Sequence, residues 1–335
     1  MRAGNTLLDW LLERYPDTSR RRAKEWIVEG RVALNGTVVR KPHQMVDLDG
    51  ADIELHQPAA ISPDLGSGWH IHPRVTLLYL DSYLTVVNKG AGLVSVPANN
   101  CKISALSIIE DFLGGRLRVR DSRISAKSLP AGLRRLNPLP VHRLDQYTSG
   151  VFCMAMNSES REHLIEQLKV HTMKREYVAF AQGRAVPTKG TWRNWLRLSK
   201  DELTQQIVTE SQGRSGGPDV LEAITHFEVI AQYQVGAHVF TQLRLKLETG
   251  RKHQIRAQAA AAGLPLIGDR TYNPDYRSEG RAPIPFDRQA LHAERLELEH
   301  PETRKRVSWR AEWPADLRDL EGMLTRNPRR MTNAK

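Results

Sequence analysis

One aspartate in this chain stands among residue types that could hold a carboxylate in place for chemistry. Asp145 comes two positions after Arg143, and residues 148–150, Thr-Ser-Gly, follow it with turn-forming side chains. Residues 151–155 are apolar and are typical of a buried strand. We therefore expect Asp145 on a loop beside a buried strand, where a rigid scaffold can position a reactive side chain.

A carboxylate in such a place can act as a nucleophile or as a general base. A glycosidase would need a second catalytic carboxylate, and only Asp145 stands in a recognisable motif. A metal centre is not expected, because His142, His253 and His292 lie far apart in the sequence and match no zinc-ligand spacing.

The rest of the sequence predicts the elements that could carry this loop. Residues 239–247 alternate apolar and polar side chains, which indicates a strand. An alanine-rich helix is expected at 255–262, closed by Gly263, and Ser158 is expected to cap another helix. Residues 189–219 are polar and are expected to leave the sheet. Further strands are predicted at 75–80, 84–87, 177–181, 223–230, 295–299 and 306–311, and further helices at 103–113 and 317–324.

Residues 142–150, HRLDQYTSG, resemble the signature of RluA-type pseudouridine synthases. Other segments of that family follow in the same order: KREYVA at 174–179, TGRKHQIR at 249–256, GDRTY at 268–272, LHA at 291–293 and HPET at 300–303. The resemblance covers residues 73–325. It departs from the family at Gln146, where a basic residue is usual, and at Asn273, where glycine is usual.

The resemblance implies a fold and a set of catalytic residues. The fold would be α+β, with a mixed, largely antiparallel sheet. Asp145 would be the catalytic carboxylate, and Arg256 would orient it and favour its ionised form. Tyr177 would stack on the base and could relay a proton. The implied reaction isomerises a uridine within RNA, so neither a metal nor a redox cofactor is required.

The same resemblance implies which residues meet the RNA. Arg143 would enter the RNA and hold the target nucleotide out of the stack, since a base inside a helix is unreachable. Further contacts with the substrate are expected from residues around the cleft, namely His142, Thr148, Arg251, His253 and Gln254.

Residues 5–55 are predicted to form a small separate module. Thr6 and Asp9 match a capping box for a first helix, and Thr18 or Ser19 can cap a second helix. A hairpin is predicted at the Asn-Gly pair that follows these helices.

This arrangement of two helices and a small sheet resembles the alpha-L RNA-binding motif of ribosomal protein S-four. Basic residues at the start of the second helix are therefore expected to contact phosphate, because free backbone N–H groups point the same way. The alternative is an ordinary solvated helix face. The residues concerned are Arg20, Arg21, Arg22 and Lys24.

We divide the chain into the module at 1–57, a linker at 58–73, a catalytic domain at 74–325 and a basic tail at 326–335. Residues 114–138 are rich in arginine and end just before the Asp145 motif. They are expected to form a basic flap beside the active site, with Arg116 and Arg118 among its RNA contacts. The alternative is a surface loop that never meets RNA.

The composition agrees with an ordinary globular protein that binds a polyanion. Of 335 residues, 40% are hydrophobic and 26% are charged, and the net charge is +11. Such a surplus indicates an RNA partner or a generally cationic surface. With two cysteines and no apolar stretch typical of a signal peptide or membrane helix, we expect a cytoplasmic monomer without a membrane partner.

These features favour an RNA pseudouridine synthase that acts on structured RNA. The N-terminal module favours ribosomal RNA of the large subunit over transfer RNA. Three alternatives stay open: a transfer-RNA pseudouridine synthase, a non-catalytic RNA-binding factor of ribosome assembly, and a glycosylase that releases free uracil. A tritium-release assay on uridine-labelled RNA separates isomerase, glycosylase and binding protein.

Overall fold

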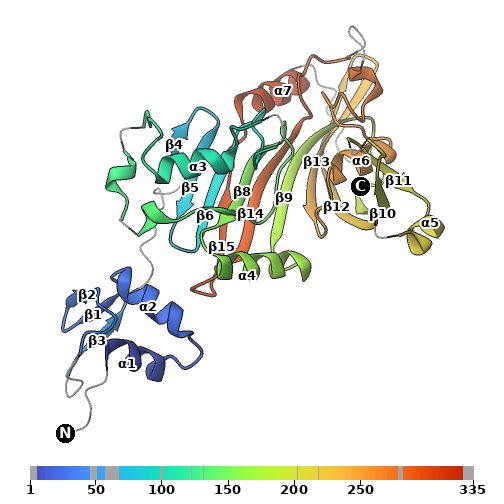
Figure 1. Ribbon diagram of the computed structural model, residues 1–335. Coiled ribbons are helices and arrows are strands. Elements are labelled where there is room, and N and C mark those ends of the chain that lie inside the picture. The colour runs from blue at the N-terminus through green and yellow to red at the C-terminus, as the bar shows by residue number, and fades with distance from the viewer. Residues whose placement is uncertain are drawn as a thin grey trace.

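The protein is described from a computed structural model, which places residues 6–45, 51–56, 68–98, 101–121, 123–130, 132–201, 203–217, 219–277 and 282–326. Figure 1 shows a small N-terminal module beside a larger domain that is built on one extended sheet. Most of the predicted linker and of the basic tail lies outside the described residues.

The N-terminal module contains α1 (Leu7–Arg14), α2 (Arg20–Val28) and a sheet of β1 (Val32–Leu34), β2 (Thr37–Val39) and β3 (Ile53–Leu55), in the order β2-β1-β3. The predicted caps are confirmed: Thr6 and Asp9 form a capping box, and the Ser19 side chain accepts from the backbone of α2. The predicted hairpin is also confirmed, because Asn35 and Gly36 both have positive φ between β1 and β2.

The large domain is organised around a 12-stranded sheet with the main order β11-β10-β12-β13-β9-β14-β8-β6-β5-β4. Every pairing along this order is antiparallel except β8 with β14, which is parallel. The predicted mixed, largely antiparallel sheet is therefore confirmed. The strands are β4 (Trp69–His72), β5 (Val75–Leu80), β6 (Leu84–Lys89), β7 (Leu139–Pro140), β8 (Ser149–Ala155), β9 (Lys174–Gln182), β10 (Lys189–Leu198), β11 (Gln205–Val208), β12 (Val220–Val235), β13 (His238–Leu247), β14 (Leu291–Glu299) and β15 (Arg306–Arg310).

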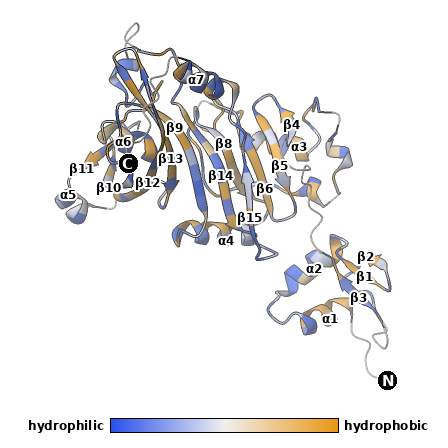
Figure 2. Ribbon diagram, turned by 180° about the vertical axis from the view of Figure 1, so that it is seen from behind, coloured by the Kyte–Doolittle hydropathy of each residue, from blue (hydrophilic) through white to orange (hydrophobic). Residues whose placement is uncertain are grey.

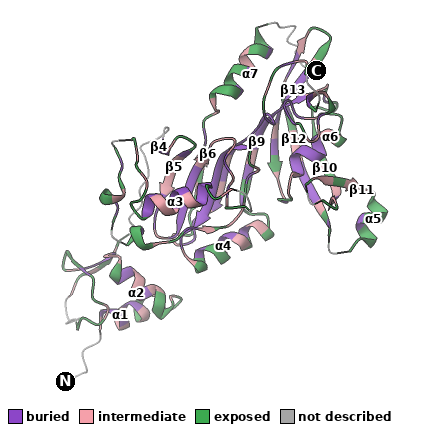
Figure 3. Ribbon diagram, turned by 45° about the horizontal axis from the view of Figure 1, so that its top comes forward, coloured by how far each residue is buried: buried purple, intermediate pink, exposed green. Residues whose placement is uncertain are grey.

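Helices cover both faces at the centre of this sheet. Along β9, Tyr177 and Ala179 face α3 (Ala105–Leu113) and α6 (Gln254–Ala261), whereas Val178 and Phe180 face α7 (Ala315–Thr325). On the α7 side, α4 (Ser158–Lys169) covers β8. Strand β8 is buried along its whole length, as expected for a strand covered on both faces. Figures 2 and 3 show the hydrophobic and buried residues gathered in these central strands.

The structure corrects several predicted boundaries. Residues 189–198 and 205–208 do not leave the sheet but form β10 and β11, since β10 pairs along most of its length with β12. Strand β4 lies inside the predicted linker. Asn157, not Ser158, caps α4, because its Oδ1 accepts from the backbone of Ser160 at 2.8 Å. The remaining short helices are α5 (Glu210–Ser215), η1 (Ala126–Ser128), η2 (Leu133–Arg135) and η3 (Pro274–Tyr276).

The arginine-rich segment 114–138 packs on the domain. Its Ile124, Leu129 and Leu133 are buried with α3 in the main core. None of its described residues lines the cavity that contains Asp145. The described part of the segment therefore does not line the cavity, and both a basic flap beside the active site and its contact with RNA stay predictions. Among the described helices, none reaches the roughly 20 apolar residues that a membrane-spanning helix needs.

A buried histidine joins the parallel strand pair at the centre of the sheet. His292 of β14 is fully buried; its Nδ1 lies 2.9 Å from Oγ of Ser149 on β8, and its Nε2 lies 3.2 Å from the carbonyl of Ala311. Burial lowers the pKa of His292 to about 4. The ring is therefore neutral in the folded protein at neutral pH.

This histidine should make the protein sensitive to acid. In the unfolded chain a histidine takes up a proton below about pH 6.5, whereas folded His292 stays neutral until about pH 4. Its contribution to stability is therefore complete above about pH 6.5 and falls as the pH is lowered. The free energy of unfolding should therefore fall when the pH is lowered from about 7 to about 5. In the His292→Gln variant this fall should be smaller by about 2 kcal/mol. Urea unfolding at both pH values measures this, with exposed His238→Gln as the control. An unchanged loss in the His292 variant would contradict the prediction.

Candidate active site

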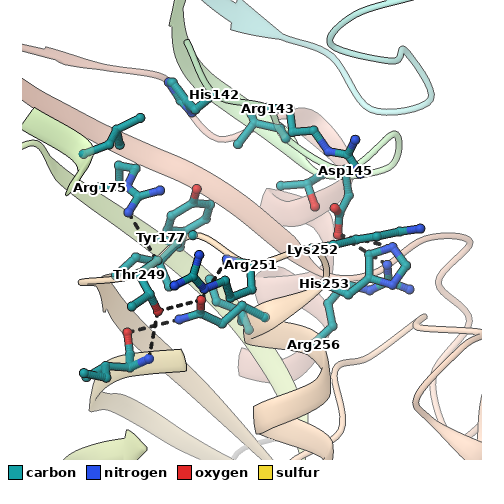
Figure 4. Close-up of a pocket in the computed structure, with 18 of the residues that line it drawn as sticks. His142, Arg143, Asp145, Arg175, Tyr177, Thr249, Arg251, Lys252, His253 and Arg256 are labelled. Carbon is teal, nitrogen blue, oxygen red and sulfur yellow. Dashed lines mark hydrogen bonds and ion pairs between the residues drawn. The ribbon is translucent and has the colours of Figure 1, made fainter. Parts of the chain in front are cut away.

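A cavity of about 880 Å³ opens between the loop that precedes β8, strand β9 and the start of α6. Figure 4 shows that Asp145, Tyr177 and Arg256 all contribute to it, from these three separate elements. The structure therefore brings together the three residues that the sequence predicted to be catalytic. Other lining residues that were predicted from the sequence are His142, Arg143, Thr148, Arg251, His253 and Gln254.

Asp145 is the first residue of a turn, and its carboxylate faces the guanidinium of Arg256. The turn is closed by the backbone N–H of Thr148, which donates to the Asp145 carbonyl at 3.1 Å. Nη1 of Arg256 donates to Oδ2 of Asp145 at 3.3 Å. The Asp145 side chain is 19% exposed, so a ligand in the cavity can reach it beside the guanidinium.

A second carboxylate fixes Arg256. Nε and Nη2 of Arg256 donate to the two carboxylate oxygens of Asp269 at 2.7 and 2.8 Å, and the Asp269 side chain is fully buried. The backbone N–H groups of Thr271 and Tyr272 also donate to Asp269 Oδ1, at 2.9 and 3.1 Å. Burial acts to lower the pKa of Arg256, but the hydrogen bonds and charge of Asp269 outweigh it and raise that pKa.

His253 forms the wall beside Asp145. It adopts a left-handed backbone conformation, with φ of 53°, just before α6. Its Nδ1 lies 3.1 Å from the hydroxyl of Tyr272, and its Nε2 lies 3.9 Å from Oδ2 of Asp145. Burial lowers the pKa of His253 to about 4. At neutral pH the ring is therefore uncharged, and Arg256 is the cation that contacts the aspartate.

Tyr177 presents an aromatic ring to the same cavity from β9. The side chain is 6% exposed, and burial raises the pKa of its hydroxyl. The hydroxyl therefore stays protonated at neutral pH. A flat, nearly buried ring close to the carboxylate provides a surface on which a flat base could stack.

The predicted RNA contacts around the cleft fall into two groups. Arg143 and Arg251 are exposed and line the cavity, so they are free to meet a substrate. His142 instead uses Nε2 to accept from the backbone of Cys153 at 3.2 Å, and burial lowers its pKa to about 3. It is therefore a neutral ring with a structural hydrogen bond at the cavity wall, and its contact with RNA stays a prediction. Thr148 is buried and accepts from Gln289 at 3.3 Å.

The expected contact of Gln254 with RNA requires a correction. Both the oxygen and the nitrogen of its side-chain amide are fully hydrogen-bonded within the protein. Its Oε1 accepts from Oγ1 of Thr249 at 2.8 Å and from the backbone of Arg251 at 2.9 Å. Its Nε2 donates to the carbonyl of Ile224 at 3.1 Å and to Oγ1 of Thr225 at 2.9 Å. Gln254 therefore shapes the loop before α6, and no donor or acceptor is left for RNA.

The basic residues of the N-terminal module differ in exposure and in ion pairing. Arg20 and Arg21 are 61% and 81% exposed and make only surface ion pairs within the module. Arg22 is 15% exposed and pairs with carboxylates of the large domain, so its guanidinium is occupied within the protein and its contact with RNA stays a prediction. Lys24 is partly exposed.

Arg116 and Arg118 lie in the arginine-rich segment at the β4 end of the sheet. Arg116 pairs with Asp111 at the end of α3, and Arg118 lines a separate cavity together with His70 and His72. Their contact with RNA stays a prediction.

The sequence did not assign two residues that build the site. Asp269 stood in a recognised segment, but nothing local showed that its carboxylate would reach Arg256. Lys89 is fully buried, and its ammonium donates to the carbonyls of Gly90, Leu93 and Gln146 at 2.8–3.1 Å. Burial lowers the pKa of Lys89 to about 7, while the nearby charge of Asp145 opposes that change.

Comparison with known proteins gives two family matches. Residues 83–261 match the RNA pseudouridylate synthase family, and residues 6–53 match the S4 domain. The first match covers more than half of the chain and includes Asp145, Tyr177 and Arg256.

Relatives match along almost the whole chain. Ribosomal large subunit pseudouridine synthase D of Yersinia pestis is 32% identical over 332 residues, which cover 96% of this chain and 91% of that protein. An uncharacterized RNA pseudouridine synthase of Bacillus subtilis is 31% identical over 311 residues, which cover 93% and 91%. The solved structure of human RNA pseudouridylate synthase domain containing 4 has a TM-score of 0.53 at 19% identity, covers 74% of this chain and 92% of that one, and shows likeness of fold.

The two aspartates that contact Arg256 should differ in what they contribute to stability. Replacing Asp269 by asparagine removes the buried charge that compensates a buried guanidinium, so the free energy of unfolding should fall by about 3 kcal/mol or more. Replacing Asp145 should cost much less, because Asp145 is partly exposed and Arg256 keeps Asp269. Urea unfolding of both variants measures the difference, and equal losses would contradict the prediction.

Proposed function

The chain belongs to the RNA pseudouridylate synthase family, and from this premise we propose that it converts uridines of large-subunit ribosomal RNA to pseudouridine. The observation that carries the proposal is the pairing of Asp145 with Arg256 in a cavity that also contains the Tyr177 ring. The site supplies a carboxylate that a ligand can reach, a cation that is fixed beside it, and an aromatic ring in the same cavity.

Asp145 can begin the reaction by either of two routes. As a nucleophile it would attack the anomeric carbon or an atom of the pyrimidine ring. As a general base it would take the ribose proton next to the anomeric carbon. In both routes the glycosidic C–N bond breaks, the base turns within the cavity, and a ring carbon joins the ribose. Any bond that the base or the ribose has formed to Asp145 is broken as this happens. The ring carbon then loses its proton to solvent, and the ring nitrogen released from the ribose takes one up, so the overall formula is unchanged.

Arg256 and Tyr177 have separate roles in this scheme. Arg256 holds the Asp145 carboxylate in place by its hydrogen bond, because Asp269 fixes the guanidinium from the opposite side. Tyr177 stacks on the base while it is detached. Its protonated hydroxyl can relay a proton when the base is rejoined.

The target nucleotide has to leave its helix before it can reach Asp145. Arg143 is exposed at the mouth of the cavity, two residues before the aspartate. We assign to it the entry into the RNA that fills the place of the displaced base, since unstacking costs a few kcal/mol.

Ribosomal RNA is favoured by the relatives and by the chain itself. Several relatives carry the name ribosomal large subunit pseudouridine synthase D. The N-terminal module matches the S4 domain and exposes Arg20 and Arg21. The net charge of +11 suits a large polyanion. We further propose that the enzyme acts as a monomer in the cytoplasm, where its two free cysteines stay reduced.

Replacing Asp145 by asparagine should abolish the reaction while RNA binding and folding stay nearly intact. The amide keeps the shape of the carboxylate but can neither attack nor take the proton. Release of tritium from uridine-labelled ribosomal RNA measures the activity, and RNA affinity and the circular dichroism spectrum serve as controls. Activity above about one per cent of wild type, equivalent to a loss below about 2.7 kcal/mol in the barrier, would count against the assignment.

Removing residues 1–58 should weaken RNA binding and spare the chemistry. The module contributes the same binding to the ground state and the transition state, so KM for structured RNA should rise while kcat at saturation changes little. Steady-state tritium release on long and short RNA measures both constants. If kcat falls on a short saturating RNA while the domain stays folded, the module has to be part of the active site.

A further inference from the structure

The turn between β14 and β15 presents a carboxylate to two arginines of the N-terminal module. Oε1 of Glu302 accepts from Nη1 of Arg31 at 2.7 Å. Oε2 accepts from Nε of Arg22 at 2.8 Å and also from its Nη2. The side chains of Glu302, Arg31 and Arg22 are 5%, 7% and 15% exposed. Both oxygens are therefore used in a nearly buried contact, where the loss of one partner leaves charge uncompensated.

The large domain holds this turn rigidly. The buried carboxylate of Asp81 accepts from the backbone of Tyr83 at 2.8 Å and lies 2.8 Å from Nε2 of His300. Nδ1 of the same histidine accepts from the backbone N–H groups of Glu302 and Thr303, both at 3.2 Å. The backbone at Glu302 is thus fixed by groups that do not involve its own side chain.

Arg31 of the module contacts both the large domain and the core of the module. Nη1 of Arg31 also donates to the hydroxyl of Tyr83 at 2.9 Å. Its Nε donates to the carbonyl of His56, the residue after β3, at 3.0 Å. Its guanidinium lies 5.2 Å from the centre of the Trp26 ring. Arg31 is therefore fixed to helix α2 and to the end of strand β3 within the module.

Helix α2 uses different faces for the large domain and for solvent. Helix α2 lies near the β14–β15 turn (Figure 1), and its Arg22 side chain reaches Glu302 in that turn. Arg20 and Arg21 point elsewhere, and their side chains stay largely exposed. The contact at Glu302 therefore uses Arg22 but leaves Arg20 and Arg21 exposed to solvent.

We propose that Glu302 is a positioning residue that docks the N-terminal module on the catalytic domain and so sets the direction in which Arg20 and Arg21 meet RNA. The docking itself rests on the contacts above, and its consequence for RNA rests on the proposed function. A docked module holds its RNA-binding face at a set place relative to Asp145. The enzyme would then prefer uridines that lie at a matching place relative to the RNA helix that the module binds.

A distance between the two domains tests the docking without any RNA. Spin labels are attached to Val38→Cys in the module and Val170→Cys after α4, both at exposed positions, in full-length protein carrying Cys101→Ser. The native Cys153 is buried and stays unlabelled. Pulsed electron spin resonance should give one narrow distance distribution. Replacing Glu302 by alanine should broaden it markedly.

A matched control removes a different carboxylate from the same domain. Glu312 is exposed and lies just after β15, so Glu312→Ala should keep the narrow distribution. Arg22 also pairs with Glu159 of α4, so adding Arg22→Gln to Glu302→Ala removes this second contact and should broaden the distribution further. Circular dichroism confirms that each variant is folded. A distribution that is broad in the parent protein, or equally narrow after Glu302→Ala, would overturn the docking.

RNA kinetics test the consequence. In Glu302→Ala, KM for a structured ribosomal RNA fragment should rise by roughly three- to tenfold, or about 0.7 to 1.4 kcal/mol. Both kcat and the KM for a short RNA that cannot reach the module should stay unchanged. A broadened distance with an unchanged KM for the long fragment would overturn the role in RNA binding. Loss of turnover in Asp145→Asn is measured separately, so a failure of the proposed function can be recognised on its own.

Discussion

The buried ion pair between Arg256 and Asp269 is the interaction on which the active site depends. A guanidinium that is taken out of water needs a carboxylate with good geometry, and Asp269 supplies one that is itself held by two backbone N–H groups. With one side of Arg256 so occupied, its remaining Nη1 points to Asp145. The Asp145 carboxylate therefore faces a cation that does not need to move, and such fixed charges are already in place when a substrate arrives.

The sheet brings these groups together because its central strands are covered on both faces. Strand β8 continues from the Asp145 loop and β9 carries Tyr177, while β14 lies between them and pairs in parallel with one and antiparallel with the other. Helix α6 packs on the face that Tyr177 shares and brings Arg256 to it. A change in the register of any of these strands would turn its side chains to the opposite face, so the position of the catalytic groups is part of the core packing.

The cavity and the N-terminal module place positive charge at two separated positions. Arg143 and Arg251 lie at the mouth of the cavity, and Arg20 and Arg21 lie on the module. Affinity for RNA comes mainly from such phosphate contacts, whereas the choice of target depends on where they are held relative to each other. The ion pairs of Glu302 with Arg22 and Arg31, together with the contacts of Arg22 with Glu159 and of Arg31 with Tyr83, relate these two positions.

Much of this protein is determined by short-range patterns in its sequence. The capping box at Thr6, the Asn35-Gly36 hairpin and the strand of residues 239–247 depend on neighbouring residues, and the structure has each of them. The family motifs likewise pointed to Asp145, Tyr177 and Arg256, which the fold brings into one cavity.

The hydrogen-bond and ion-pair partners of the polar side chains were decided only by the tertiary structure. Gln254 and Arg22 are polar residues in motifs that indicate RNA binding, yet one is enclosed by Thr249 and Ile224 and the other meets Glu302. The partners of Asp269 and Lys89 lie in other segments of the chain. Strand β10 was not predicted from the sequence, because its polar residues do not reveal that it pairs with β12. These relations depend on residues far apart in the sequence, and no local spacing or composition contains them.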